Sequence, residues 1–214
     1  MYEGEINMVI HADGGTADVY VEPEQITIVL ADSGPGIADI ELAMQAGYST
    51  CLLYTSQDLT RRLFDNFIRT QPVTLCWRKI DGVWTIKEDP FIDDWTEAEY
   101  RVLVDCLQNT VKTGGFVLGA FIDDKLKGFV SVEPTLFGSR KQYMDLSSIH
   151  VSQDVRAQGI GRQLFDRAKA FAKARGAEKL YISAHSAVES QAFYRAMGCK
   201  EAQEYNQSLS LIHI

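Results

Sequence analysis

The amino-acid sequence predicts an α+β fold, a mixed and mostly antiparallel sheet layered by helices, over the larger C-terminal part of the chain. Three observations support this prediction. Some segments alternate apolar and polar residues as strands do, others place apolar residues three and four apart as helices do, and the two kinds follow one another along residues 57–207. A chain of 214 residues that is 46% hydrophobic can bury the core that such a fold needs.

The expected elements begin with a helix over residues 58–69, where apolar residues have helical spacing. A hairpin follows over 76–86 around Asp81-Gly82, a favoured two-residue turn. A second helix is predicted over 96–112, because Thr96 and Glu99 have the spacing of a capping box.

The rest of this part mixes strands and helices. Strands are expected where apolar residues alternate, at 116–122, 126–133, 143–151 and 180–184. One helix is expected over 162–175, and a last one opens at a capping box formed by Ser186 and Glu189 and closes at Gly198.

Charge divides the chain into two unlike segments. Residues 1–50 contain nine acidic residues and no lysine or arginine, whereas 57–207 contain all 21 basic residues and 20 acidic ones. This contrast predicts two modules, an acidic one before a nearly neutral one. The formal net charge of −8 argues against a nucleic-acid partner, and no apolar run approaches the roughly 20 residues of a membrane span. Four unpatterned cysteines favour the cytoplasm over a disulfide framework.

The acidic segment carries two motifs, Glu3-x-x-x-Asn7 and, after strand-like stretches at 17–22 and 25–31, Asp32-Ser-Gly-Pro-Gly36. Together they resemble the GHKL ATPase superfamily, specifically its anti-sigma-factor serine kinases. The resemblance implies that Glu3 is a base, Asn7 a Mg²⁺ ligand and Asp32 the acceptor for the amino group of adenine. The second glycine box and the lid of that family are missing. We therefore interpret 1–50 as a truncated ATPase-like α/β fragment and expect no binding of ATP or Mg²⁺.

Two hexapeptides, Cys51-Leu-Leu-Tyr-Thr-Ser56 and Leu209-Ser-Leu-Ile-His-Ile214, have a shared feature at the DNA level. One nucleotide string encodes both in two reading frames, and that string looks like the transposon end left by a sequencing-library kit. The alternative is two apolar, strand-like hexamers. Our hypothesis is a chimeric open reading frame, with 51–56 as an adapter-derived joint and 208–214 as an adapter-derived tail.

The chemistry of the second segment is expected where the strand at 148–151 leads through Arg156-Ala-Gln-Gly-Ile-Gly161 into a helix. Glycines at 159 and 161 leave backbone N–H groups accessible at a helix N-terminus, which is a ready anion site. An R-x-x-G-x-G run alone also suits an ordinary tight turn. About 33 residues further on comes Phe193-Tyr-Arg-Ala-Met-Gly198.

This arrangement resembles the GNAT superfamily of acetyl-CoA-dependent N-acetyltransferases over residues 57–207. The resemblance implies acetyl-CoA as co-substrate, with the backbone of Ile149, His150 and Val151 pairing with the pantetheine arm and the acetyl carbonyl. It also implies that backbone amides hold the pyrophosphate, namely those of Arg156, Ala157, Gln158, Gly159, Ile160, Gly161 and Arg162. Tyr194 would protonate the leaving thiolate. GNAT sheets continue after the position of Gly198, so we expect the last strand to be missing.

The attacking amine must be neutral, so a general base is expected, directly or through water. Asp145 is the leading candidate, because the histone-acetyltransferase branch of the family carries a glutamate eleven residues before the position of Arg156. His185 is the rival, and His150 and Glu133 are weaker candidates. Each of these residues also has a purely structural interpretation.

The sequence thus predicts transfer of an acetyl group from acetyl-CoA to a primary amine by direct attack in a ternary complex. The alternatives are an ATP-binding anti-sigma-factor kinase remnant in 1–50 and a non-catalytic acyl-CoA-binding module. The expected partner is a small-molecule or peptide amine, with no nucleic acid, membrane or metal, and the oligomeric state is left open. Three tryptophans, Trp77, Trp84 and Trp95, are assigned either to an acceptor pocket or to the core.

Overall fold

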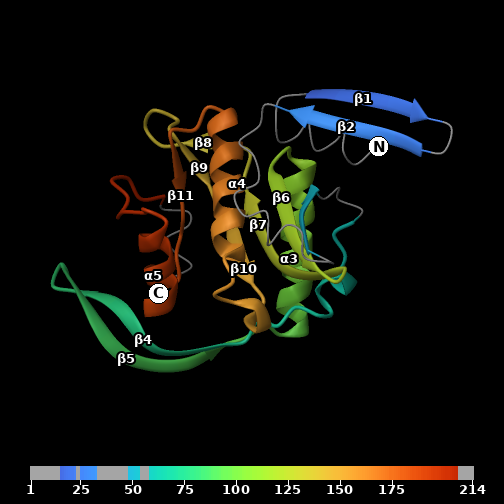
Figure 1. The fold of residues 1–214 in the computed structure, drawn as a ribbon. Coiled ribbons are helices and arrows are strands. Elements are labelled where there is room, and N and C mark those ends of the chain that lie inside the picture. Colours follow the sequence, from blue (N-terminus) through green and yellow to red (C-terminus); the bar gives the residue numbers. More distant parts are fainter. Residues whose placement is uncertain (1–14, 23–24, 33–47, 54–57, 207–214) are drawn as a thin grey trace. The chain divides into compact units, whose positions relative to one another are not determined.

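The computed structural model describes residues 15–22, 25–32, 48–53 and 58–206, and the chain divides into two compact units, Met1–Gln45 and Ala46–Ile214 (Figure 1). In the first unit, β1 (Gly15–Glu22) and β2 (Gln25–Asp32) form an antiparallel hairpin. These strands confirm the ones predicted at 17–22 and 25–31. Glu3 and Asn7 lie outside the described residues.

The second unit contains two sheets that are joined to each other by backbone hydrogen bonds. One sheet has the order β10 (Ser148–Val151), β7 (Lys125–Val132), β6 (Phe116–Ile122), β3 (Tyr48–Leu53), and its pairs are antiparallel. The other has the order β11 (Lys179–Tyr181), β9 (Tyr143–Asp145), β8 (Leu136–Phe137), with β11 and β9 parallel. The backbone N–H of Glu133 donates to the carbonyl of Asp145 at 2.8 Å, so the end of β7 meets the end of β9.

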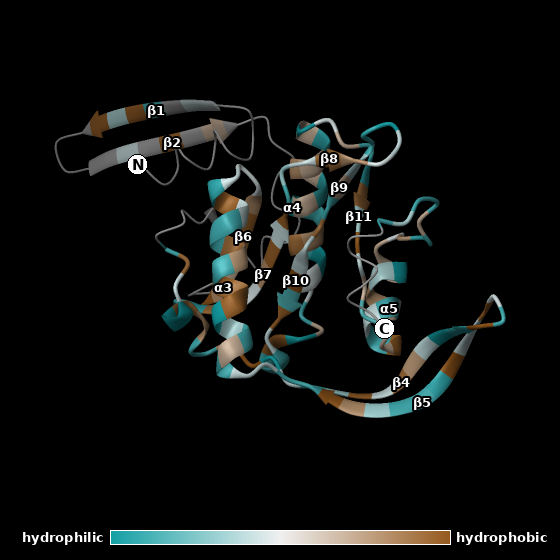
Figure 2. Cartoon of the chain, turned by 180° about the vertical axis from the view of Figure 1, so that it is seen from behind, coloured by the Kyte–Doolittle hydropathy of each residue, from teal (hydrophilic) through white to brown (hydrophobic). Residues whose placement is uncertain are grey.

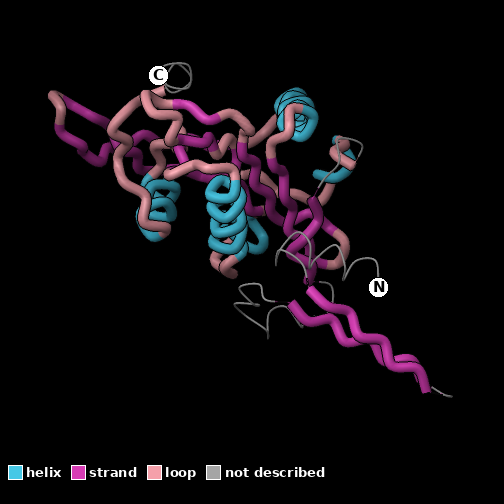
Figure 3. Tube along the Cα trace, turned by 90° about the horizontal axis from the view of Figure 1, so that it is seen from above, coloured by secondary structure: helices cyan, strands magenta, loops and turns pink. Residues whose placement is uncertain are grey.

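Helices cover both faces of these strands. Figure 3 shows α3 (Glu97–Lys112) on one face and α4 (Ile160–Ala174) and α5 (Val188–Ala196) on the other. Because side chains alternate along a strand, β6 and β7 supply both cores. Leu118 and Val130 pack with Leu164 of α4, whereas Val117 and Phe129 pack with Leu107 of α3. The mixed α+β class predicted from the sequence is confirmed.

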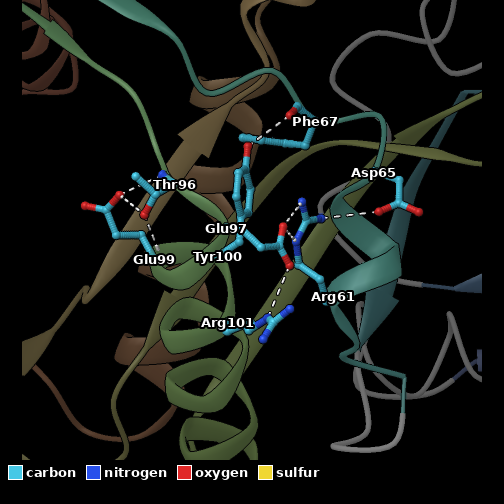
Figure 4. Close-up of polar contacts among 8 residues, drawn as sticks. All are labelled: Arg61, Asp65, Phe67, Thr96, Glu97, Glu99, Tyr100 and Arg101. Atoms are coloured by element: carbon cyan, nitrogen blue, oxygen red, sulfur yellow. Dashed lines mark hydrogen bonds and ion pairs between the residues drawn. The ribbon is translucent and has the colours of Figure 1, made fainter.

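The capping box predicted for α3 is present. The Thr96 hydroxyl accepts from the Glu99 N–H at 3.3 Å, and the Glu99 carboxylate accepts from the Thr96 N–H at 2.7 Å (Figure 4). The same end of the helix is held to the preceding segment, since Tyr100 donates to the Phe67 carbonyl and Arg61 bridges Glu97. The start of α3 is therefore stabilised both by its local capping box and by two tertiary contacts with residues 61–67.

The helix predicted over 58–69 is wrong. Only a 3-10 turn, Arg61–Phe64, forms, and the side chain of Thr60 before it makes no capping bond. Leu59, Phe64 and Phe67 are nevertheless buried in the core under α3. The apolar spacing therefore identified these three buried residues, whereas Ile68, which has the same spacing, is 44% exposed. An irregular segment buries the three side chains without forming a helix.

The single strand predicted over 143–151 is interrupted. Residues 146–147 separate β9 from β10, and the Leu146 N–H turns to the Tyr181 carbonyl at 2.9 Å. β9 therefore pairs with β11, while β10 ends its sheet as an edge strand. Tertiary pairing to two different neighbours divides a segment that reads as one strand in the sequence.

Two expected helix starts differ in the structure. Helix α4 begins at Ile160 rather than 162. The capping box expected at Ser186 and Glu189 is absent, because α5 is preceded by Ala187 without a side-chain cap. The Ser186 hydroxyl instead accepts from Arg78 at 2.6 Å, a tertiary bond that replaces the local one.

The hairpin at Asp81-Gly82 is confirmed and is longer than predicted. Strands β4 (Gln71–Ile80) and β5 (Val83–Asp93) flank the two turn residues, which both have positive φ. Figure 2 shows apolar and polar residues interspersed along this arm, and Trp84 is 48% exposed. The arm is anchored four residues before its turn to the segment that precedes α5, where the Trp77 N–H donates to the Ser186 carbonyl at 2.8 Å.

Strand β3 differs from the expected domain organisation. It pairs with β6, with Leu52 opposite Gly119 and Leu53 opposite Leu118. The sequence instead predicts a joint over 51–56 and a domain that begins at 57. Without β3, the outer edge of β6 would have unpaired backbone N–H and carbonyl groups. Any extended segment can form hydrogen bonds with such an edge, whatever DNA encodes that segment. The sheet therefore begins before residue 57.

Candidate functional site

The predicted site lies where β10 ends, turns and enters α4. The Ser152 N–H donates to the Lys127 carbonyl of β7 at 2.8 Å. Because backbone direction alternates along a strand, the amides of Ile149 and Val151 point away from β7, toward the side where β10 has no partner strand in the described chain. These are two of the three residues expected to pair with the pantetheine arm. The third, His150, has its amide turned toward β7.

The loop after β10 leads to an exposed helix N-terminus. Gly159 precedes α4 with φ +84° and ψ −8°, and it supplies no capping side chain. A Cβ built on Gly159 would meet no atom within 4 Å. The first amides of α4, from Ile160 to Arg162, have no intrahelical acceptors because they belong to the first turn. This open space in front of a helix dipole fits the pyrophosphate that the sequence placed here.

Backbone conformation shapes this loop as well. Ala157 adopts φ +64°, a left-handed conformation that is costly for a residue with a side chain, and Gly159 is left-handed two residues later. The Arg156 side chain turns back, and its Nε donates to the Val151 carbonyl at 3.3 Å. The loop is thus bent back toward β10 by a side-chain hydrogen bond and two left-handed residues.

A second segment, residues 66–70, braces the loop and was missed by the sequence reasoning. The Ile68 N–H donates to the Ser152 hydroxyl at 2.9 Å, and the Ile68 carbonyl accepts from the Gln153 N–H at 2.9 Å. Lys127 joins both sides, because its ammonium donates to the Asn66 carbonyl and to Asp154. No motif in 66–70 signals this role, since the bond between Ile68 and Ser152 joins residues 84 positions apart.

The second half of the family motif packs directly against the loop. A Cβ added at Gly161 would lie 3.1 Å from Cε2 of Phe193 and 3.6 Å from Cγ2 of Val151. Glycine at 161 therefore allows α5 to approach the start of α4 and the end of β10. The glycine loop therefore packs against Phe193 of α5 in the structure.

Tyr194 has the properties of a proton donor. Burial, together with the neighbouring Cys199 thiol, raises the pKa of Tyr194 to about 12. The phenol therefore stays protonated at neutral pH. Its ring packs beside Phe193, at 5.3 Å between centroids, and it lines a cleft together with Phe165 of α4.

Asp145 is buried at the end of β9, next to the interruption in the strand. It is 8% exposed, and its Oδ1 is buried without a hydrogen-bond partner among the described residues. Burial, and then the charge of Glu133, raise the pKa of Asp145 to about 6. A carboxylate with such a pKa can accept a proton near neutral pH.

The two histidines have other surroundings. His185 Nδ1 accepts the Ala187 N–H at 3.1 Å, so this ring helps to fix the chain before α5. His150 lies edge-on to Trp95, at 4.7 Å between centroids, and beside Phe129. Burial, followed by the charges of Arg69 and Arg156, lowers the pKa of His150 to about 3. His150 is therefore neutral at physiological pH and has little affinity for a proton.

A large cleft of about 1350 Å³ lies beside the site but does not reach Gly159. It borders the candidate catalytic groups only at Tyr194 and His185. Trp77 and Trp84 line it, whereas Trp95 packs in the core under α3. The sequence left open whether the three tryptophans lie in an acceptor pocket or in the core. Trp95 lies in the core, and Trp77 and Trp84 line the cleft.

Within the described part of the chain, no helix combines the length and the apolar character needed to cross a bilayer.

An α+β domain in which an edge strand runs into an open glycine turn at a helix N-terminus has the architecture of an acyl-CoA-dependent transferase. The profile of the acetyltransferase (GNAT) family matches residues 80–199. The chain belongs to this family, and it is an N-acetyltransferase with acetyl-CoA as co-substrate.

Solved structures agree with this fold. Nourseothricin acetyltransferase is 19% identical with a TM-score of 0.52, and the match covers 71% of this chain and 82% of that one. A putative streptothricin acetyltransferase from Bacillus anthracis str. Ames, in complex with acetyl coenzyme A, is 16% identical with a TM-score of 0.52, covering 68% of this chain and 81% of that one. A comparison with curated protein sequences finds no match.

Proposed function

We propose that the second unit transfers the acetyl group of acetyl-CoA to a primary amine by direct attack in a ternary complex. The observation that carries this proposal is the continuity of the outward-facing amides of β10 with the open amides in front of α4. One thioester donor could lie along both, with its acyl group at Ile149–Val151 and its pyrophosphate at Gly159–Arg162. Holding donor and amine in attack geometry would supply much of the rate.

The residues then have the following roles. A backbone N–H of β10 polarises the acetyl carbonyl and stabilises the negative oxygen that forms upon attack. Asp145 accepts the proton of the amine through water, which the raised pKa supports. Tyr194 donates its proton to the thiolate of coenzyme A as it leaves. His185 is the weaker candidate for the base, because its Nδ1 already accepts a backbone hydrogen bond.

The acceptor is a small-molecule or peptide amine. The cleft beside Tyr194 supports this class, because the aromatic rings of Trp77, Trp84 and Phe91 line it and can contact an amine-bearing ligand. The two structural neighbours are described as acetyltransferases of nourseothricin and streptothricin, so streptothricin-type amines belong in a first screen.

The test combines binding with turnover. Titration calorimetry should show that acetyl-CoA binds the chain, and a thiol-release assay across a panel of amines should show coenzyme A formed with at least one of them. Binding without release for any amine would favour the alternative of a non-catalytic acyl-CoA-binding module. Absence of binding would refute the proposal.

We propose further that residues 1–50 are a separate, truncated GHKL-like fragment, joined through an adapter-derived stretch at 51–56, in a cytoplasmic protein. The charge contrast and the division of the chain near residue 45 support two modules, and the free cysteines Cys76, Cys106 and Cys199 suit a reducing compartment. ATP should not bind, and calorimetry with ATP and Mg²⁺ tests this. Resequencing of the source DNA across codons 45–60 tests the joint, and an uninterrupted natural gene there would contradict it.

A further inference from the structure

Two carboxylates meet where β7 ends and β9 breaks off. Glu133 follows β7, and its N–H donates to the Asp145 carbonyl at 2.8 Å. The Glu133 side chain faces α3, because its carboxylate accepts from Thr110. Asp145 faces the same way, since the preceding Met144 points into the core under α4 and side chains alternate. Both acidic side chains therefore lie on one face of neighbouring strands.

Hydroxyl groups converge on the Glu133 carboxylate. Its Oε1 accepts from the Thr110 hydroxyl at 2.7 Å and from the Ser147 hydroxyl at 2.8 Å. The Ser131 and Ser147 hydroxyls are 2.8 Å apart, and because Ser147 donates to Glu133, Ser131 is the donor in that pair. Donors directed at a carboxylate stabilise its negative charge. The Glu133 carboxylate is thus held in place by the hydroxyls of Thr110 on α3 and of Ser147 in the break between β9 and β10, and Ser131 of β7 supports Ser147.

Asp145 has no comparable support. Its buried Oδ1 finds no donor among the described residues. The ionisable groups that face it are Glu133 at the end of β7, Tyr143 on its own strand, and Tyr181 and Lys179 on β11, with the Lys179 ammonium over the Tyr143 ring. Helix α3 contributes the uncharged Thr110. Of the charged groups in this set, Glu133 is the one whose charge raises the pKa of Asp145, after burial.

We propose that Glu133 is a positioning residue for acetyl transfer, which acts on Asp145 from the same face of the neighbouring strand, where hydroxyl groups hold its carboxylate in place. The inference rests on the proposed role of Asp145 as the base. As the nitrogen–carbon bond forms, the proton of the amine passes through water to Asp145, and the Tyr194 proton goes to the departing thiolate. The carbon–sulfur bond breaks in the same step, after which Asp145 returns its proton to solvent and Tyr194 regains one from solvent. Glu133 takes no part in these transfers, and it acts only through its charge and its hydrogen bonds.

The first test is the pH profile of kcat/KM for the Glu133→Gln variant, with Asp105→Asn on the exposed face of α3 as a control for loss of a carboxylate. The acid limb of the profile should move to lower pH in Glu133→Gln, by less than half of the rise in the Asp145 pKa from 3.8 to about 6, because burial is the larger cause of that rise. It should be unchanged in Asp105→Asn and restored in Glu133→Asp. An unmoved limb in Glu133→Gln would overturn the inference.

A second test uses the unaltered protein, so that the inference can be tested even if a variant folds poorly. The carboxyl carbon of Asp145, followed by NMR as the pH changes, should show a second inflection where Glu133 titrates, because coupled groups share their titration steps. A single-step curve would contradict the coupling. If Asp145→Asn retains full activity, the base assignment in the proposed function fails. If it is inactive while Glu133→Gln shows no shift, only the present inference fails.

Discussion

Two variants, Gly159→Ala and Gly176→Ala, distinguish the binding of a ligand at the glycine loop from the need for glycine at a left-handed backbone position. Both glycines flank α4, both have nearly the same left-handed φ (+84° and +85°), and at both a Cβ would meet no atom within 4 Å. Gly159 precedes the helix and Gly176 follows it, about 22 Å away for a helix of 15 residues. The two variants impose the same strain at opposite ends of one element.

The magnitudes follow from that geometry. An alanine in the left-handed region costs about 1–2 kcal/mol, so both variants should lose several degrees in melting temperature. Only at Gly159 would the new methyl group occupy the space assigned to the pyrophosphate. Losing one hydrogen bond to a charged group costs about 1.5–3 kcal/mol, which is roughly a ten- to hundredfold weaker Kd for acetyl-CoA.

Calorimetric titration with acetyl-CoA, together with thermal unfolding, measures both effects. We expect equal losses of stability in the two variants and weaker binding in Gly159→Ala alone. If both variants bind acetyl-CoA as the unaltered protein does, the pyrophosphate does not lie in front of Gly159. Equal weakening in both would show that affinity follows stability rather than contact.

Three further outcomes are expected. Tyr194→Phe should lower kcat in the thiol-release assay by about tenfold or more with little change in the Kd for acetyl-CoA, because it removes only the proton donor; an unchanged kcat would contradict that role. The raised pKa of Asp145 means that the folded state binds its proton more tightly than the unfolded state, whose value is near 3.8, so this contribution to stability is present below about pH 4 and is lost as the pH rises through about 6. Urea unfolding of Asp145→Asn should therefore show a gain of up to about 3 kcal/mol at pH 7 and none at about pH 4, and equal values at both would argue against the shift. Thr96→Ala should destabilise the protein by about 1 kcal/mol through loss of the α3 cap, and a smaller loss is expected for Glu99→Ala.

The candidate site illustrates how far sequence reasoning extends. The open helix N-terminus at Gly159 could be predicted because the residues that form it lie within a few positions of one another, and anion binding there stays a prediction. Asp145 could be singled out by its spacing from Arg156, but its lack of a donor could not, because that depends on Thr110 and Ser147 being directed to Glu133 instead.

The brace formed by residues 66–70 had no signal at all. Its contacts with Ser152 and Gln153 use backbone groups, and backbone groups are the same in every sequence. The same reason explains the failure at Ser186, whose hydroxyl could serve either the start of α5 or Arg78. Local and tertiary hydrogen bonds compete for one side chain, and the sequence shows only the local partner.

By itself the sequence determined the features whose physics is local. The cap of α3 and the turn at Asp81-Gly82 depend on residues within about four positions of one another, and both formed as predicted. The glycine entry to α4 is equally local, although the helix begins at Ile160 rather than 162. The tertiary structure alone decided which edge each extended segment pairs with. It divided 143–151 between two neighbours and placed 48–53 against β6, because strand pairing satisfies backbone groups that any extended segment can offer.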